Sequence, residues 1–160
     1  MAGTVEQGDG KHEELSAARP SAAGGYERDT QPVIRGKWIL LVDDEPEVAA
    51  VLMEVLHLDG YEVESVENGE EALEKLRQRA YDVIVSDIRM PKVDGSALYR
   101  AIEQWQPQLV RRFLFLTGDT LSSGTREFLE RTGAPSISKP FGLEEMRLAL
   151  HRVLEVNDQP

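Results

Sequence analysis

The chain has 160 residues, enough for one ordinary domain with a sizeable hydrophobic core. It contains no cysteine, which excludes disulfides and thiolate metal sites and favours a reducing cytoplasm. Its formal net charge of -11 disfavours binding to nucleic acid, because the phosphate backbone is also negative. No apolar stretch is long enough to cross a bilayer, so we expect no membrane partner.

The first part of the chain differs in composition from the rest. Residues 1–36 mix small, polar and charged residues without periodicity, and such a segment cannot bury enough apolar area to offset the entropy of ordering. We therefore predict a flexible leader over 1–36, one folded domain over 37–156 and a short tail over 157–160.

The folded part begins with a strand and a helix. "WILLV" is a continuous apolar run, typical of a strand that is covered on both faces. Pro46 suits the first turn of the helix that follows, and Gly60 ends it. Helical spacing predicts that one face of this helix carries Val48, Val51, Leu52, Val55 and Leu56.

The middle of the chain repeats this pattern. "YEVES" alternates as a strand does, and in "ENGEEALEKL" Asn68 and Glu71 form a predicted capping box at the start of a helix. "YDVIVSD" is a second buried strand, "GSALYRAIEQW" a helix and "RFLFLTGD" a third apolar strand.

The last predicted elements are "TREFLERTG", a helix with Gly133 at its end, and "PSISKP", a short and weak strand. A closing helix is indicated by an apolar stripe of Leu143, Met146, Leu150, Val153 and Leu154. Strands and helices thus alternate five times. Because parallel strands need crossovers and these are right-handed, the pattern predicts a doubly wound α/β domain with helices on both faces of a parallel sheet.

Polar residues with a common chemistry follow four of these strands. The first strand ends in Asp43 and Asp44, the third in Asp87, the fourth in Thr117, and the fifth in Lys139. In an open α/β sheet the ligand crevice lies beyond the carboxyl ends of the strands, so we expect these side chains to meet there.

Three carboxylates brought together repel one another, at about 4 kcal/mol per close pair for an effective dielectric near 20. A hard cation such as Mg²⁺ relieves this repulsion with carboxylate, carbonyl and water ligands. A metal-bound carboxylate beside a lysine and a hydroxyl is arranged for a phosphoryl group, because a carboxylate can attack phosphorus while the cations offset the charge on the transferring oxygens.

At these residues the chain resembles the receiver domain of two-component response regulators, in the style of receivers associated with hybrid sensor kinases. The matching segments are "ILLVDDEPEV", "VIVSDIRMPKVDG", "FLFLTGD" and "SISKPF", in that order. The resemblance implies a flavodoxin-like five-stranded sheet of order 2-1-3-4-5. It also implies phosphoryl transfer to an aspartate from a histidine kinase or a histidine phosphotransfer protein, followed by contact with a downstream protein partner.

Carried over position by position, the resemblance makes Asp87 the phosphoacceptor, Thr117 the switching hydroxyl and Lys139 the partner of the phosphoryl oxygens. Mg²⁺ would be bound by Asp44, Asp87 and the backbone carbonyl of Arg89, with Asp43 as a direct or water-mediated ligand. In "MPKVDG", Pro91 and Gly95 would have backbone roles in the loop after the acceptor.

The chain departs from the family in one place and invites a hypothesis in another. Ser136 stands three residues before Lys139, where the family often has a Tyr or Phe that swings inward on activation. Arg89 and Asp119 resemble the pair that controls access of water to the acyl phosphate, so we expect them to approach each other over the site and slow hydrolysis.

Three functions remain open from the sequence. The first is a phosphoacceptor that signals by protein contact without an attached output domain, since the chain ends soon after the last predicted helix. The second is a degenerate receiver that acts as a constitutive binding module. The third is a Mg²⁺-dependent phosphohydrolase with an aspartyl-phosphate intermediate. A resemblance to such enzymes would need a strand that ends in Asp-x-Asp, with the second Asp as general acid. The position two beyond Asp87 is Arg89 instead, which cannot act as a general acid at neutral pH.

Overall fold

The structure is a computed structural model that describes residues 36–90, 92–118 and 122–158. The predicted leader, apart from Gly36, and residues 159–160 of the predicted tail lie outside the described residues. Pro91 and Asp119 lie outside them as well.

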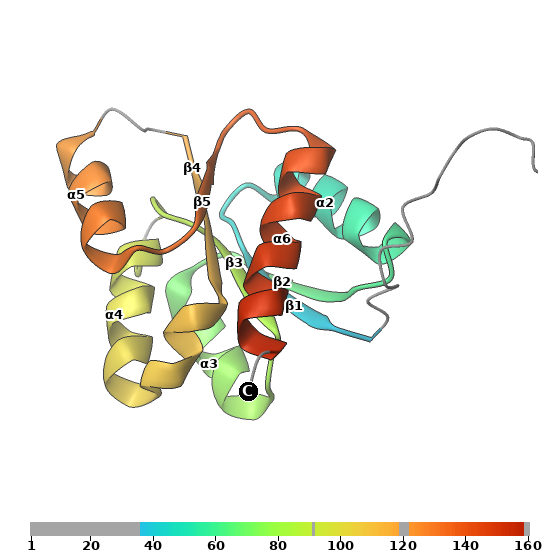
Figure 1. Cartoon of the computed structure of the whole chain (residues 1–160). Helices are drawn as coiled ribbons and strands as arrows, with labels where there is room; N and C mark the ends of the chain where they lie inside the picture. Colours follow the sequence, from blue (N-terminus) through green and yellow to red (C-terminus); the bar gives the residue numbers. More distant parts are fainter. Residues whose placement is uncertain (1–35, 91, 119–121, 159–160) are drawn as a thin grey trace, which may run out of the picture. The chain divides into compact units, whose positions relative to one another are not determined.

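The described chain forms a sheet of five parallel strands in the order β2-β1-β3-β4-β5 (Figure 1). The strands are β1 (Trp38–Val42), β2 (Glu62–Val66), β3 (Val83–Asp87), β4 (Phe113–Thr117) and β5 (Ser136–Ser138). This is the flavodoxin-like topology that the sequence resemblance implied.

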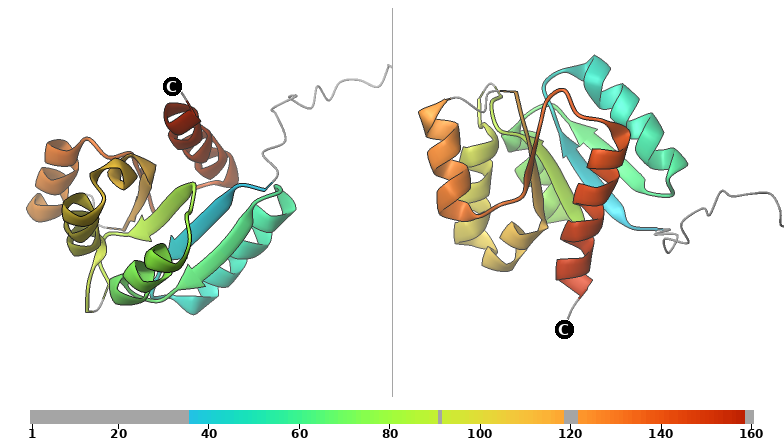
Figure 2. Two further views of the ribbon diagram at one scale, coloured as in Figure 1. Left: turned by 90° about the horizontal axis from the view of Figure 1, so that it is seen from below. Right: turned by 45° about the horizontal axis from the view of Figure 1, so that its top comes forward.

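Helices cover both faces of the sheet (Figure 2). They are α2 (Pro46–Leu58), α3 (Gly69–Gln78), α4 (Gly95–Trp105), α5 (Ser123–Thr132) and α6 (Leu143–Asp158). One apolar core joins α2 and α6 to the sheet, and a second core joins α3, α4 and α5 to the opposite face. None of the helices in the described part combines the length and hydropathy that a membrane span requires.

Local sequence signals account for several helix ends. The Asn68 side chain accepts a hydrogen bond from the Glu71 N–H at 2.9 Å, as a helix cap does. The Glu71 carboxylate in turn accepts a hydrogen bond from the backbone N–H of Glu67 at 3.1 Å, one residue before the cap. Gly133 ends α5 in the left-handed conformation, at φ 66°.

Two of the predicted apolar stripes are wrong in part. Val51 is 61% exposed and Leu143 is 45% exposed, although both were expected to face the core. The buried face of α2 is formed instead by Ala49, Leu52 and Leu56. The apolar stripe predicted for each of these helices is wider than the contact that the helix makes with the sheet, so its edge remains in water.

A short 3-10 helix, η2 (Pro107–Arg112), lies between α4 and β4 and was not predicted. Pro107 cannot continue α4, and Leu109 is the single buried residue of the η2 segment. Two neighbouring aliphatic residues, Leu109 and Val110, give no periodic signal in so short a segment, which explains why the sequence did not reveal it.

The loop between β3 and α4 fixes the position of Asp87. The Gly95 N–H donates to the carbonyl oxygen of Ile88 at 2.8 Å. A Cβ atom on Gly95 would collide with the carbonyl oxygen of Asp87. Only glycine therefore lets α4 begin this close to the end of β3, and the expected backbone role of Gly95 is found.

Replacing Gly95 by alanine is expected to lower the free energy of unfolding by about 2 kcal/mol, because overpacking against backbone forces the chain to move. Urea denaturation measures this change. Gly118→Ala is the matched control, since a Cβ there would meet no atom within 4 Å and the change should be below about 0.5 kcal/mol. Equal losses in the two variants would contradict the steric argument.

Candidate functional site

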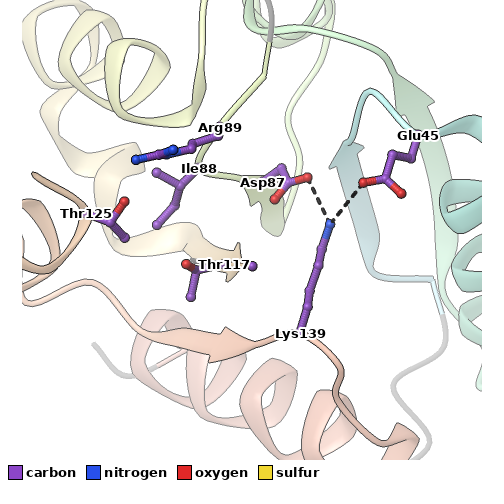
Figure 3. A pocket seen from close by; sticks show the side chains of 8 residues that line it. Glu45, Asp87, Ile88, Arg89, Thr117, Thr125 and Lys139 are labelled. Carbon is purple, nitrogen blue, oxygen red and sulfur yellow. Dashed lines mark hydrogen bonds and ion pairs between the residues drawn. The ribbon is translucent and has the colours of Figure 1, made fainter. Parts of the chain in front are cut away.

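The sequence-predicted site residues meet at the carboxyl edge of the sheet. Asp87 ends β3 and Thr117 ends β4, while Asp43 and Lys139 directly follow β1 and β5. Asp87, Thr117 and Lys139 line a cavity of about 250 Å³ (Figure 3). Its lining residues are Glu45, Asp87, Ile88, Arg89, Thr117, Gly118, Thr125 and Lys139.

Strand register brings the acidic residues together. Val42 of β1 pairs with Ser86 of β3, so the next residues along, Asp43 and Asp87, leave the sheet side by side. Carboxylate oxygens of Asp43, Asp44, Glu45 and Asp87 all lie within 4.8 Å of one another. Asp43 and Asp87 are buried, whereas Asp44 and Glu45 are more open to solvent.

Lys139 is the cation that faces this cluster among the described residues. Its Nζ lies 3.0 Å from Oδ2 of Asp87, with which it forms a hydrogen bond. The same nitrogen lies 3.8 Å from Oδ2 of Asp43 and 4.0 Å from Oε1 of Glu45. One ammonium therefore stands against four carboxylates, and the site retains an excess of negative charge.

One buried oxygen of the cluster lacks a hydrogen bond. Oδ1 of Asp43 accepts from the Glu45 N–H at 2.9 Å, but the buried Oδ2 has no hydrogen-bond partner among the described residues. The lysine at 3.8 Å is too distant to donate to it. A buried carboxylate oxygen without a donor is costly in a protein alone and is satisfied by a bound cation. The four carboxylates thus fit a Mg²⁺ ion by ligand type.

Burial and mutual repulsion also change the acidity of the cluster. Burial raises the pKa of Asp87 to about 6, against the lowering effect of the hydrogen bond and charge of Lys139. Asp43 and Asp44 add to this rise by repulsion. Burial likewise raises the pKa of Asp43. Near neutral pH Asp87 is therefore ionised but destabilised, which favours any process that brings a cation or a covalent bond to it.

Thr117 and Arg89 occupy the other side of the cavity. Thr117 is buried, and its side chain faces the cavity from the end of β4 (Figure 3). Arg89 is exposed, and its guanidinium points away from Asp87, where Nη2 donates to Oγ of Ser122 at 2.9 Å. The predicted approach of Arg89 to Asp119 falls outside the described residues, because Asp119 is not among them.

Sequence reasoning missed two residues with polar side chains that line the cavity. Glu45 is the third acid in "VDDEP", and its position directly after the strand end was the available signal. Thr125 is buried in α5 and contributes a second hydroxyl-bearing side chain to the cavity wall. No sequence pattern indicated Thr125, since a polar residue in the first turn of a helix is ordinary.

Comparison with known proteins identifies the family. A family model described as the response regulator receiver domain matches residues 39–151. The chain belongs to the receiver domain family of two-component systems. The resemblance found in the sequence motifs is thereby confirmed, and receivers are signalling domains rather than metabolic enzymes.

Individual relatives agree with this assignment. The chain is 33% identical over 124 residues to the transcriptional regulatory protein TrcR of Mycobacterium tuberculosis, covering 72% of this chain but only 44% of that longer relative. It is 30% identical over 118 residues to the response regulator receiver protein CpdR of Brucella abortus, covering 74% of this chain and 97% of CpdR.

A solved structure is similar as well. It is the receiver domain of the sensor histidine kinase PA1611 from Pseudomonas aeruginosa PAO1, with a magnesium ion coordinated in its active site cleft. The TM-score is 0.67 at 33% identity, over 75% of this chain and 98% of that one. Similarity to the receiver of a sensor kinase agrees with the style of the motifs.

The raised pKa of Asp87 makes a prediction about stability. The folded-state pKa of about 6 lies above the ordinary value of 3.8, so the folded protein binds the proton more tightly than the unfolded chain does. Stability without metal therefore falls as pH rises through this window and stays lower above it. Asp87→Asn should raise the free energy of unfolding by ~1–2 kcal/mol at pH 7, less than the shift alone gives because Lys139 loses a partner.

Urea denaturation with a chelator at pH 7 and pH 4 measures this effect. The gain should shrink toward zero at pH 4, where Asp87 is already neutral in the folded protein. Glu74→Gln removes the same charge from an exposed position of α3 and is the control. A gain that persisted at pH 4, or that Glu74→Gln reproduced, would show that the charge of Asp87 is not its source.

Proposed function

We propose that this receiver accepts a phosphoryl group on Asp87 from a phosphohistidine of a histidine kinase or a histidine phosphotransfer protein. The observation that carries the proposal is the environment of the Asp87 carboxylate. It is buried, it is held by Lys139 at 3.0 Å, and it lines a cavity of about 250 Å³.

The transfer requires one new bond and one broken bond. A carboxylate oxygen of Asp87 attacks phosphorus, the O–P bond forms, and the N–P bond to the donor imidazole breaks with protonation of that ring. Oδ2 is bonded to Lys139, which leaves Oδ1 as the oxygen that attacks. Lys139 then neutralises charge on the phosphoryl oxygens, and Thr117 orients one of them through its hydroxyl.

The proposed metal ligands are Asp43, Asp44, Asp87 and the backbone carbonyl of Arg89. A bound Mg²⁺ supplies positive charge that offsets the repulsion between the carboxylates and the incoming phosphoryl group. The oxygen of Asp43 without a hydrogen bond supports this assignment. Glu45 belongs to the same acidic group and holds Lys139 at 4.0 Å when no phosphoryl group is present.

Phosphorylation acts as a switch in this proposal. The covalent group changes the charge of the site, and the surface around α5 and α6 shifts between two populated states that a downstream protein partner distinguishes. The domain that does this extends over about 37–156, and α6 continues two residues further, to Asp158.

The competing functions have less support. A degenerate receiver that binds constitutively would have no use for an acceptor and a lysine in contact, yet Lys139 and Asp87 form a hydrogen bond. A phosphohydrolase would need a second acid beyond the acceptor, whereas Arg89 occupies that position and turns its guanidinium away from Asp87 (Figure 3). We therefore favour the phosphoacceptor.

Intact mass after incubation with acetyl phosphate tests the acceptor. The wild-type chain should gain a single phosphoryl group in the presence of Mg²⁺ and none with a chelator, since the carboxylates must be neutralised before a phosphate can approach. Asp87→Asn should gain none. Glu74→Gln, which leaves the site unchanged, should behave as the wild type does.

A mass gain that survives in Asp87→Asn would place the acceptor elsewhere. Absence of any gain with acetyl phosphate and with a phosphorylated histidine phosphotransfer protein would favour the constitutive binding module instead.

The metal assignment has its own test, which needs no phosphoryl donor. Titration calorimetry with MgCl₂ should show one site in the wild type. Asp43→Asn should weaken binding roughly tenfold or more, because one buried anionic oxygen near the ion is lost. Equal Mg²⁺ affinity in wild type and Asp43→Asn, with Glu74→Gln as reference, would remove Asp43 from the ligand set.

A further inference from the structure

A second cleft lies between α4 and α5, two helices that Figures 1 and 2 show side by side. It has a volume of about 440 Å³, and its lining residues are Tyr99, Arg100, Glu103, Gln104, Arg131 and Thr132. The last two of these end α5, which connects two parallel strands and so ends near the edge of the sheet opposite Asp87. The cleft shares no lining residue with the cavity beside Asp87.

Tyr99 forms the buried wall of this cleft. Only 6% of the residue is exposed. The centroid of its ring lies 5.3 Å from that of Phe113, 6.1 Å from that of Phe115 and 5.5 Å from that of Phe128. Three aromatic rings thus hold the tyrosine ring in one orientation, and the part of Tyr99 that remains exposed opens into the cleft.

The hydroxyl of Tyr99 makes no hydrogen bond with any residue that the structure describes. Burial and the nearby Glu103 carboxylate raise the pKa of Tyr99, so the hydroxyl keeps its proton at neutral pH and remains a donor. The hydroxyl of a buried tyrosine usually has a partner, as in Tyr81, which donates to the Glu64 carboxylate at 2.8 Å. Tyr99 therefore presents to the cleft a fixed donor that lacks an acceptor within the described chain.

Two arginines from different helices line the same cleft. Arg100 belongs to α4 and Arg131 to α5, and both are exposed. Neither forms a hydrogen bond or an ion pair with a described residue, although Glu103 lies one helical turn beyond Arg100. The lining thus contains two guanidinium groups and one carboxylate, an excess of positive charge in a chain whose net charge is -11.

These groups determine which ligand chemistry the cleft fits. Guanidinium groups bind the paired oxygens of carboxylates and phosphates, and the Tyr99 hydroxyl adds a further donor. The Glu103 carboxylate accepts hydrogen bonds only, so it favours a ligand that also carries a hydroxyl or amino group. A volume of about 440 Å³ lies within the range of small-molecule sites and exceeds what a single inorganic ion fills.

We propose that the cleft between α4 and α5 binds a small organic anion. Its oxyanion group, a carboxylate or a phosphate monoester, is bound by Arg100, Arg131 and the hydroxyl of Tyr99. A hydroxyl or amino group next to the oxyanion donates to Glu103. Binding at this cleft goes beyond the phosphoacceptor function and does not depend on it, because the two sites have no residue in common.

NMR titration of the isotope-labelled full chain tests the proposal, at constant ionic strength and with a chelator to keep metal from the acidic cluster. Malate supplies carboxylates beside a hydroxyl, and glycerol phosphate supplies a phosphate beside hydroxyls. At least one of these probes should shift the amide signals of residues 99–104 and 131–132 saturably, with a dissociation constant of about 1 mM or lower. Glycerol, which lacks the oxyanion, should not shift them.

A conservative variant tests the tyrosine hydroxyl. Tyr99→Phe keeps the ring among its aromatic neighbours and should weaken binding of the probe about tenfold, because one hydrogen bond to a charged group is lost. Tyr61→Phe is the matched control, since it removes the hydroxyl of another buried tyrosine, in the core that α2 and α6 cover. This control should bind the probe as the wild type does.

Charge variants test the two arginines. Arg100→Gln and Arg131→Gln should each weaken binding of the probe about tenfold, because a charge-assisted pair of hydrogen bonds is lost. Arg152→Gln removes the same charge from an exposed position of α6 and should leave the affinity unchanged. The difference between these variants separates a defined site from a general effect of net charge.

The two probes also distinguish the source of the oxyanion. Saturation by malate alone identifies a carboxylate ligand, saturation by glycerol phosphate alone identifies a phosphate ester, and saturation by both identifies a site that accepts either group. The proposal is overturned if neither probe gives saturable shifts at the cleft, or if shifts appear only around Lys139. It is also overturned if Tyr99→Phe, Arg100→Gln and Arg131→Gln all bind the probe as the wild type does.

Discussion

The repulsion between Asp43 and Asp87 is the constraint on which the rest of the site depends. The parallel register of β1 and β3 pairs Val42 with Ser86, so the carboxylates that follow these two residues come out of the sheet next to each other. Seven apolar residues of these strands are completely buried: Ile39, Leu40, Leu41, Val42, Val83, Ile84 and Val85. Each contributes ~1.5–3 kcal/mol, which together exceeds the ~4 kcal/mol of one close carboxylate pair. The core therefore forces the charges together, and in the proposed function Mg²⁺ and the phosphoryl group relieve that repulsion.

Lys139 relieves this repulsion only in part, and the partial relief suits a switch. An ammonium at 3.0 Å from Asp87 keeps the carboxylate ionised near neutral pH, although burial raises its pKa to about 6. A second cation at the same place would satisfy the carboxylates fully and leave nothing for Mg²⁺ to do. Asp43 retains a buried oxygen that no donor reaches within the described chain, which leaves room for the metal ion of the proposed function.

The sequence predicted the fold and the site to the extent that both follow from the backbone. Strands that are apolar throughout, such as Trp38–Val42, show their burial in the sequence, and the residue that follows each strand must lie at one edge of a parallel sheet. The strand order came from the family resemblance and not from the pattern itself. What the sequence missed depends on the direction of side chains. The exposure of Val51, the cavity position of Thr125 and the bond from Arg89 to Ser122 are set by packing between distant segments, which no local periodicity records.

The two faces of the sheet are held with unequal firmness, and this determines where a signal can leave the domain. On one face Arg147 of α6 donates two hydrogen bonds, of 2.7 Å and 3.1 Å, to the carboxylate of Asp59 next to α2. This bidentate geometry resists sliding of α6 along α2. On the other face, the side chain of the N-cap residue Ser122 makes no capping hydrogen bond at the start of α5. Phe128, which joins this helix to the core, meets the rings of Tyr99 and Phe115 edge-on, at 5.5 Å and 5.3 Å between centroids. A change at Asp87 that supplies only a small free energy will move the helix that is held less firmly, which is α5. Under the proposed function we therefore expect α5 to move more than α6 within the surface that the two helices share, which fits an exposed Ser136 where the family often places an aromatic residue.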